Sequence, residues 1–275
     1  MHTLVEGTHA VPGASLHYQV RGAGPALLLM SGGHGDANSF DGMAAVLAEH
    51  FTVVSYDRRG YARSPLVDPA APQTVATHGD DAAALLRAVA NGPAYVFGTS
   101  AGAVVGLDLV ARHPGLARTL VAHEPPVVRL LPPTERPAPP VELLEQLRVA
   151  GPVAAMDTFR AMLGVDLDDG EPDAEPQPQD PARARANATF FFTREAPALD
   201  QFTPDLAALK ASPVHLIPAG GTTGHEAFPY RCAVALAERL GLPLTPFPGG
   251  HAGFVTHPRA FTRQLLTVLA NGPAR

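Results

Sequence analysis

YVFGTSAGAVVG, residues 95–106, joins an apolar run of strand length to a segment of small residues that predicts a helix. At the junction lies a Gly-x-Ser-x-Gly pattern, in which Gly98 and Gly102 let the backbone turn sharply and pack closely. We therefore expect Ser100 at the tip of a strand-to-helix turn, above the N-terminus of the helix. A free serine is a weak nucleophile, so this placement predicts a base nearby. The competing interpretation is a chance match in a glycine-rich chain, which a strand before and a helix after disfavour.

Apolar runs of strand length alternate with helix-like segments on both sides of this turn. Such alternation is typical of strands and crossover helices stacked into a mostly parallel sheet. The chain is therefore predicted to be an α/β protein with a mostly parallel central sheet flanked by helices. The expected strands are 15–20, 25–30, 51–56, 94–98, 116–124, 213–218 and 243–247, and the expected helices are 77–92, 101–113, roughly 225–240, and 258–270.

The alternation is interrupted by a proline-dense, mainly helical segment at 125–204. This segment contains an acidic, low-complexity stretch at 166–180, which we expect to be solvated and mobile. The predicted organisation is a core formed by 1–124 and 205–275, with 125–204 inserted as a helical cap.

The composition excludes several classes of partner and site. The chain of 275 residues is 46% apolar and 17% charged, and it has no run of about 18 apolar residues that would predict a membrane span. Its formal charge of −6 argues against a general affinity for nucleic acid, which needs clustered Lys and Arg. Cys232 is the only cysteine, which excludes an internal disulfide and a cysteine-rich metal site. The N-terminus lacks the basic start and apolar core of a secretory signal, so we expect a cytoplasmic protein. We expect it to be a monomer or a homodimer.

A base for Ser100 is offered by the stretch PFPGGHAGF, residues 246–254. His251 follows the last expected strand through two glycines and precedes the final helix. That order brings it to the same edge of the sheet as Ser100, where it would serve as the base. The alternative is a histidine of a surface loop with no part in the chemistry.

Together these motifs resemble those of the α/β-hydrolase family over essentially the whole chain. GTSAG (98–102) resembles the nucleophile elbow, LLLMSGGHG (27–35) the loop after the third strand, SYDRRGYARS (55–64) the segment after the fourth, and GGHAGF (249–254) the loop of the catalytic histidine. The order serine, acid, histidine is also that of the family. The resemblance implies an α/β-hydrolase fold and a serine hydrolase, similar to an esterase, that acts on a small molecule without a cofactor or a metal.

The resemblance also implies an oxyanion hole. In the family, the oxyanion is held by the backbone N–H after the nucleophile and by one from the loop after the third strand, which correspond here to Ala101 and Gly33. Many relatives begin this loop with His-Gly, whereas here it reads Ser31-Gly32, with His34 two residues later. The second donor is therefore Gly33 or His34.

The charged segment at 55–64 has a structural interpretation. In the family it generally shapes the core near the active site. The resemblance thus implies that Asp57, Arg58 and Arg59 are structural, and we do not place them among the catalytic residues.

The third member of a triad must accept a hydrogen bond from the histidine and orient its ring. In most α/β hydrolases it is an aspartate after the strand that follows the cap, but that slot holds Thr222 and Thr223 here. Glu226 is close by, at the expected start of a helix, where the helix dipole also accounts for an acidic residue. A second slot, used in some haloalkane dehalogenases, lies at the end of the strand before the cap, where this chain has Glu124. We favour Glu124 over Glu226, and the remaining alternative is that no acid operates.

The leading hypothesis is a cofactor-independent hydrolase that cleaves an ester, thioester or lactone through an acyl-enzyme on Ser100. Haloalkane dehalogenases and epoxide hydrolases need an aspartate nucleophile, so both are disfavoured. Alternatives are perhydrolysis or carbon–carbon bond hydrolysis by the same triad, and a ligand-binding protein without catalysis on the same fold. Apolar residues at helical spacing in the cap favour a hydrophobic substrate. The residues expected to line its pocket are His34, Phe159, Met162 and Phe191.

Overall fold

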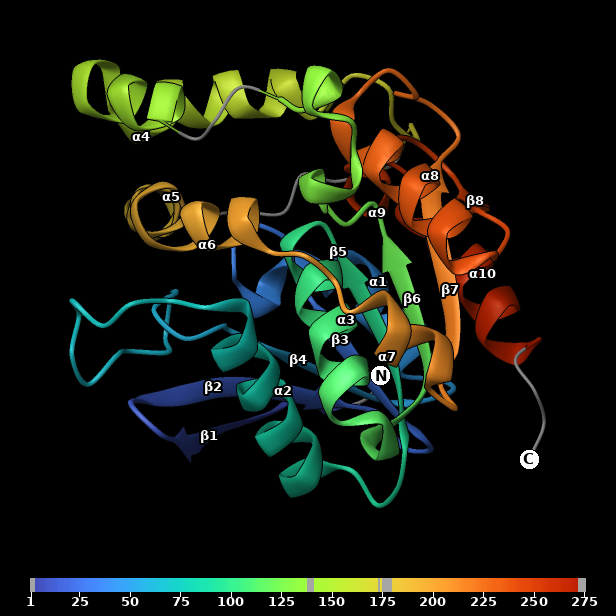
Figure 1. Ribbon diagram of the computed structural model, residues 1–275. Coiled ribbons are helices and arrows are strands. Elements are labelled where there is room, and N and C mark those ends of the chain that lie inside the picture. Colours follow the sequence, from blue (N-terminus) through green and yellow to red (C-terminus); the bar gives the residue numbers. More distant parts are fainter. Residues whose placement is uncertain (1–2, 138–140, 173, 175–179, 272–275) are drawn as a thin grey trace.

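The chain folds around one central β-sheet. The computed structural model describes residues 3–137, 141–172, 174 and 180–271. The strands of the sheet are β1 (Val5–Val11), β2 (Ala14–Arg21), β3 (Ala26–Met30), β4 (Thr52–Tyr56), β5 (Ala94–Thr99), β6 (Ala117–His123), β7 (His215–Gly221) and β8 (Thr245–Phe247). Within the described residues they form an eight-stranded sheet in the order β1-β2-β4-β3-β5-β6-β7-β8 (Figure 1). β2 runs antiparallel to both β1 and β4, and every other neighbouring pair is parallel.

Helices cover both faces of this sheet. One face carries α2 (Val75–Val89), α3 (Ala101–Arg112), α7 (Leu206–Ala211) and α8 (Phe228–Leu240), and the other carries α1 (Asp41–Leu47) and α10 (Pro258–Ala270). Leu28 packs in the first of the two cores, while Leu27 and Leu29 pack in the second, because alternate residues of a strand point to opposite faces. The predicted α/β architecture with a mostly parallel sheet is thus confirmed.

Several elements are missing from the sequence-based prediction, among them β1, α1, α7 and the short helix α9 (Gly253–Thr256). β1 is an edge strand that pairs only with β2, and most of its residues are not buried, so it has no apolar run. α1 has seven residues and a glycine at its second position, which is too short a segment for a helical period to stand out.

The described part of 125–204 is mainly helical. It contributes α4 (Val141–Met162), α5 (Pro181–Phe190) and α6 (Ala196–Gln201), with a π-helical turn at Phe191–Glu195 between the last two. Gly151 has a φ of 84° beside Pro152, so α4 is two helices joined at a kink. Figure 1 shows these helices gathered at one end of the molecule, beyond the tip of the β6 arrow. A cap with boundaries at 125 and 204 stays a prediction.

The acidic stretch 166–180 is anchored in the part that the structure describes. The carboxylate of Glu171 accepts the backbone N–H groups of Arg259 and Ala260, at 3.1 and 2.9 Å, and so caps the first turn of α10. The N–H of Glu171 in turn donates to the carbonyl oxygen of Thr256 at 2.8 Å. Residues 173 and 175–179 lie outside the described residues, so mobility of the stretch stays a prediction.

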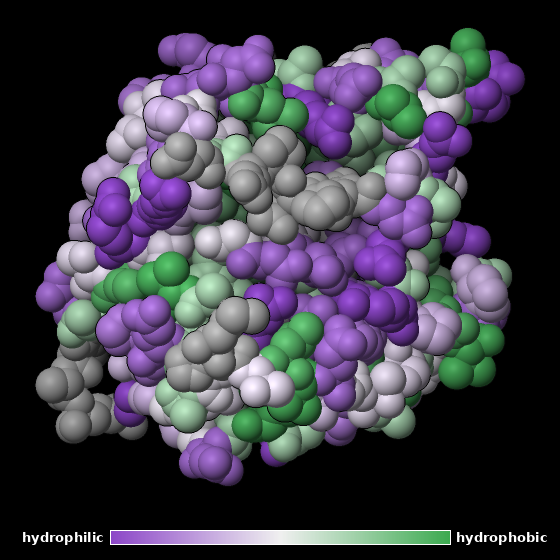
Figure 2. Space-filling model, turned by 180° about the vertical axis from the view of Figure 1, so that it is seen from behind, coloured by the Kyte–Doolittle hydropathy of each residue, from purple (hydrophilic) through white to green (hydrophobic). Residues whose placement is uncertain are grey.

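The surface is mixed on the face that Figure 2 shows, where hydrophobic residues form small separate groups among hydrophilic ones. Such scattered apolar side chains are ordinary for a folded domain. No helix in the described part of the chain is long and apolar enough to cross a membrane.

Candidate active site

Ser100 lies in the turn between β5 and α3, in a conformation that glycine adopts more readily than serine. Its backbone has φ 53° and ψ −125°. A Cβ on Gly98 would lie 2.6 Å from the carbonyl oxygen of Gly102, and a Cβ on Gly102 would lie 2.1 Å from that of Met30. Only glycine therefore fits at both positions, and this close packing fixes Ser100 above the first turn of α3.

The loop after β3 lies directly against Ser100. A Cβ on Gly32 would be only 3.1 Å from the Cβ of Ser100. Among the described residues, no acceptor is found for the backbone N–H of Gly33 or of His34. The N–H of Ala101 belongs to the first turn of α3, where N–H groups have no partner within the helix. The arrangement therefore leaves backbone donors available on two sides of Ser100.

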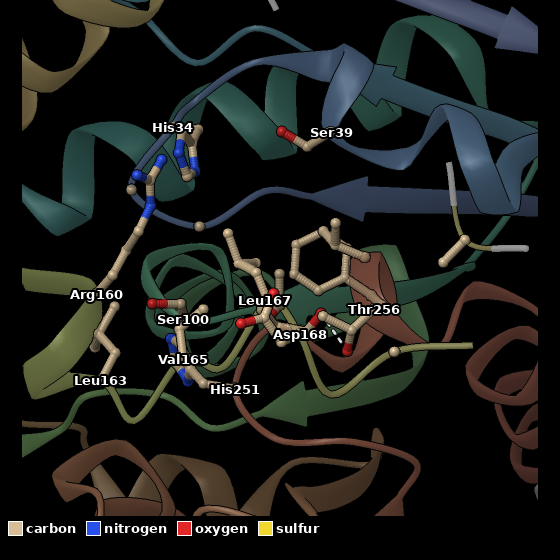
Figure 3. A pocket seen from close by; sticks show the side chains of 18 of the residues that line it. His34, Ser39, Ser100, Arg160, Leu163, Val165, Leu167, Asp168, His251 and Thr256 are labelled. Carbon is tan, nitrogen blue, oxygen red and sulfur yellow. Dashed lines mark hydrogen bonds between the residues drawn. The ribbon is translucent and has the colours of Figure 1, made fainter. Parts of the chain in front are cut away.

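His251 and Glu124 form a buried hydrogen bond. Nδ1 of His251 lies 2.7 Å from Oε2 of Glu124, and the two side chains are 7% and 1% exposed. Oε1 of Glu124 accepts the N–H of Gly221 at 2.8 Å. An ionised carboxylate can only accept hydrogen bonds, so the proton of a neutral imidazole sits on Nδ1 and leaves Nε2 as an acceptor. Figure 3 shows Ser100 and His251 side by side in the wall of one cavity.

Glu124 is held in place by the end of β6. Its backbone has a φ of 46°, and its N–H donates to the carbonyl oxygen of Ala219 in β7 at 2.9 Å. Burial raises the pKa of this carboxyl, but the hydrogen bond from His251 and the positive charge that the imidazole can carry outweigh it. The pKa of Glu124 therefore lies below its ordinary value, and the group is a carboxylate at neutral pH.

The loop after β7 does not bring a carboxylate to His251. Glu226 is exposed in a turn just before α8, and Thr222 and Thr223 are exposed as well. The end of β7 contributes instead the N–H of Gly221, which donates to the carboxylate of Glu124 at the end of β6. Of the two acids that the sequence left open, the structure joins Glu124 to His251.

A cavity of about 600 Å³ opens beside Ser100 and His251. Part of its wall is formed by residues 156, 159 and 160 of α4, which lie on one face of the helix, and by residue 163 in the turn that follows it. Of the four residues predicted to line it, His34 and Phe159 do so, while Met162 and Phe191 do not. Met162 is off the lining face of α4, and Phe191 is 3% exposed because its ring packs on Gly33.

The polar part of the cavity wall includes His34 and Arg160. Figure 3 shows the head group of Arg160 directed toward His34. Burial and the charges of Arg160 and Arg58 lower the pKa of His34 to about 4, so this imidazole is neutral at neutral pH. Arg160 also pairs with the exposed Asp157 at 2.9 Å.

Sequence comparison places the chain in a known family. The chain matches the family model of the α/β hydrolase fold over residues 25–184. It is also 41% identical over 271 residues to the uncharacterized hydrolase YraK of Bacillus subtilis (strain 168), a match that covers 97% of each chain. The chain belongs to the α/β hydrolase fold family.

Two other proteins resemble this α/β hydrolase over nearly their whole length. A zearalenone hydrolase of Cladophialophora bantiana is 28% identical over 262 residues, which are 92% of each chain. The structure of a thermophilic esterase from Thermogutta terrifontis has a TM-score of 0.76 at 18% identity, covering 99% of this chain and 100% of that one. The second likeness is one of fold.

Some contacts at the site of this α/β hydrolase escaped the sequence analysis. Asn187 in α5 donates to the carbonyl oxygen of His34 and accepts the N–H of Ala62, both at 3.0 Å. Glu195, in the π-helical turn, forms a fully buried ion pair with Arg58. The partners in these contacts are more than a hundred residues apart, so no local pattern joins them.

Proposed function

We propose that the protein is a cofactor-independent serine hydrolase that cleaves an ester, thioester or lactone through an acyl-enzyme on Ser100. The observation that carries this proposal is the 2.7 Å hydrogen bond between His251 and Glu124 beside the cavity that Ser100 lines. Because the bond occupies Nδ1, it leaves Nε2 of His251 to act as the base, and it gives Glu124 the role of orienting the ring.

In the first half-reaction, Ser100 gives its proton to Nε2 of His251 as its Oγ attacks the substrate carbonyl. The resulting oxyanion is held by the N–H of Ala101 and by that of Gly33 or His34, and Glu124 stabilises the imidazolium. His251 then returns the proton to the departing alcohol or thiol. In the second half-reaction a water molecule takes the place of the serine hydroxyl, and its attack on the acyl group releases the acid and restores Ser100.

The cavity supports a substrate that is small and mainly hydrophobic. Its volume of about 600 Å³ lies within the usual range for small-molecule sites, roughly 300–1,000 Å³. Met156 and Phe159 of α4 and Leu163 just after it line the cavity and favour an apolar acyl or alcohol group. The match to a zearalenone hydrolase supports hydrolytic chemistry and leaves the substrate of this chain open.

A fluorophosphonate that reacts with activated serines tests the proposal. We expect one phosphonyl group on the wild-type protein, detected by intact-protein mass spectrometry, and none on Ser100→Ala. The matched control is Ser39→Ala, because Ser39 also lines the cavity but has no histidine assigned as its base. It should be labelled like the wild type. Equal labelling of Ser100→Ala and the wild type would overturn the proposal.

A further inference from the structure

The loop after β3, which would supply the second oxyanion donor, accepts hydrogen bonds from an arginine that has no role in the proposed reaction. Arg58 is completely buried, and its Nη1 and Nη2 donate to the carbonyl oxygens of Ser31 and Gly32, the latter at 2.9 Å. Its backbone N–H donates to the carbonyl oxygen of Gly35 at 2.8 Å. One residue therefore holds three carbonyl groups of the loop that runs past Ser100.

The bond to Gly32 also determines where the N–H of Gly33 points. A trans peptide is planar, so its C=O and its N–H point in opposite directions. Fixing the oxygen of Gly32 against Arg58 therefore aims the N–H of Gly33 away from Arg58, and no acceptor for it is found among the described residues. Gly33 itself lines the cavity next to Ser100. The N–H of Gly33 is therefore available beside Ser100 as a donor to an oxyanion.

The same bond makes this N–H a stronger donor. The oxygen of Gly32 accepts the N–H of Gly35 at 3.0 Å in addition to the guanidinium of Arg58. Hydrogen bonds to a carbonyl polarise its peptide group, and bonds from an ionised donor do so most. The positive charge of Arg58 thus acts on an oxyanion through the peptide between Gly32 and Gly33.

Arg58 depends in turn on the segment inserted after β6. The carboxylate of Glu195, in the π-helical turn, accepts hydrogen bonds from Nε and Nη2 of Arg58, at 3.0 and 2.7 Å. It also accepts one from the hydroxyl of Tyr61. Burial raises the pKa of Glu195, but the charge of Arg58 and these hydrogen bonds outweigh it and keep the pKa below its ordinary value. Phe191 of the same turn packs on Gly33 from outside the loop.

We propose that Arg58 is a positioning residue of the oxyanion hole, and that Glu195 holds it there so that the inserted segment supports the geometry of the reaction. This inference rests on the proposed function of Ser100. A buried ion pair is often no more stabilising than apolar residues of the same volume, so its presence calls for a reason besides stability. The carbonyl groups that Arg58 holds provide that reason.

The test compares Arg58→Met with Arg59→Met in the full-length protein. Arg59 is the matched control, since it also forms a buried ion pair, with Asp81, and among the described residues its side-chain hydrogen bonds go to Asp81 and Pro12 and not to the loop after β3. With p-nitrophenyl butyrate we expect Arg58→Met to lower kcat by roughly 10- to 100-fold, less than the loss of a whole oxyanion donor, with KM within about threefold. Arg59→Met should lower the thermal unfolding temperature but leave kcat within about twofold.

A trifluoromethyl ketone supplies a second measurement that a purely structural role would not change. Its adduct with Ser100 carries an oxyanion, so Ki should rise in Arg58→Met by the same factor by which kcat/KM falls. Glu195→Gln keeps the shape of the side chain and should show the same correlated changes, of roughly three- to tenfold. It carries the test if Arg58→Met does not fold.

Two outcomes are decisive against the idea. If kcat and Ki are the same in Arg58→Met and Arg59→Met, or unchanged in Glu195→Gln, the inference is overturned while the proposed function stands. If the wild type shows no turnover that depends on Ser100, the proposed function fails and the inference fails with it.

Discussion

Replacing Glu124 by glutamine is expected to lower kcat for a short-chain ester by about three to four orders of magnitude, with little change in KM. The carboxylate accepts two hydrogen bonds, from His251 on Oε2 and from Gly221 on Oε1. An amide has only one acceptor oxygen, so glutamine can satisfy one of these donors and must turn its NH2 group toward the other. If the NH2 faces His251, the proton moves to Nε2 and the imidazole can no longer accept a proton from Ser100.

The matched control for this prediction is Glu226→Gln, which makes the same chemical change in an exposed turn. Its kcat is expected to stay within about twofold of the wild type, because surface substitutions away from partners have small effects. Steady-state kinetics on both variants, with thermal unfolding to show that each is folded, measures the difference. A large loss in Glu226→Gln and none in Glu124→Gln would return the acid to the loop after β7.

The effect of pH on this difference follows from the lowered pKa of Glu124. A carboxyl whose pKa is lowered by folding stays ionised at neutral and mildly acidic pH. Its negative charge is lost only as the pH falls through that lowered pKa. The advantage of the wild type over Glu124→Gln should therefore persist from neutral to mildly acidic pH. A difference that disappears on mild acidification would contradict an ionised Glu124.

The sequence predicts those parts of the site that local chain geometry determines. Ser100 stands between two glycines at a junction of strand and helix, and His251 follows the last strand through two more, so both could be placed at one edge of the sheet. Glu124 could be weighed against Glu226 because the usual slot holds threonines and β6 ends at the same edge. The sequence favoured Glu124, and the structure shows that its carboxylate reaches His251.

The parts that escaped prediction depend on helix phase or on contacts between distant segments. Met162 and Phe159 are three residues apart on α4, yet only Phe159 lines the cavity. The apolar pattern of the helix does not show which of its apolar residues face the cavity. Phe191 begins a π-helical turn, and its ring packs on Gly33. Arg58 and Glu195 are 137 residues apart, and the sequence around either residue does not indicate that the other is its partner.

Replacing His251 by alanine is expected to lower kcat by about five to six orders of magnitude, about as much as removing the nucleophile Ser100. Without the imidazole, no group accepts the proton of Ser100, and the remaining acceleration comes from the oxyanion donors and from binding. The control is His257→Asn in the neighbouring loop. His257 bonds to the hydroxyl of Thr256 at 2.9 Å and does not line the cavity, so kcat should stay within about threefold of the wild type, in line with a substitution away from the site.

The double variant His251→Ala/Glu124→Gln separates catalysis from stability. Glu124 acts on the reaction only through His251, so the second substitution should cost no further turnover, whereas independent roles would make the two losses multiply. Although it has one substitution more, the double variant should be more stable than His251→Ala. His251→Ala leaves the carboxylate of Glu124 buried with only the N–H of Gly221 as a partner, and an uncompensated buried charge is destabilising. Glutamine removes that charge, so the double variant should unfold at a higher temperature than His251→Ala. A further large loss of kcat in the double variant would show that Glu124 contributes to the reaction by a route other than His251.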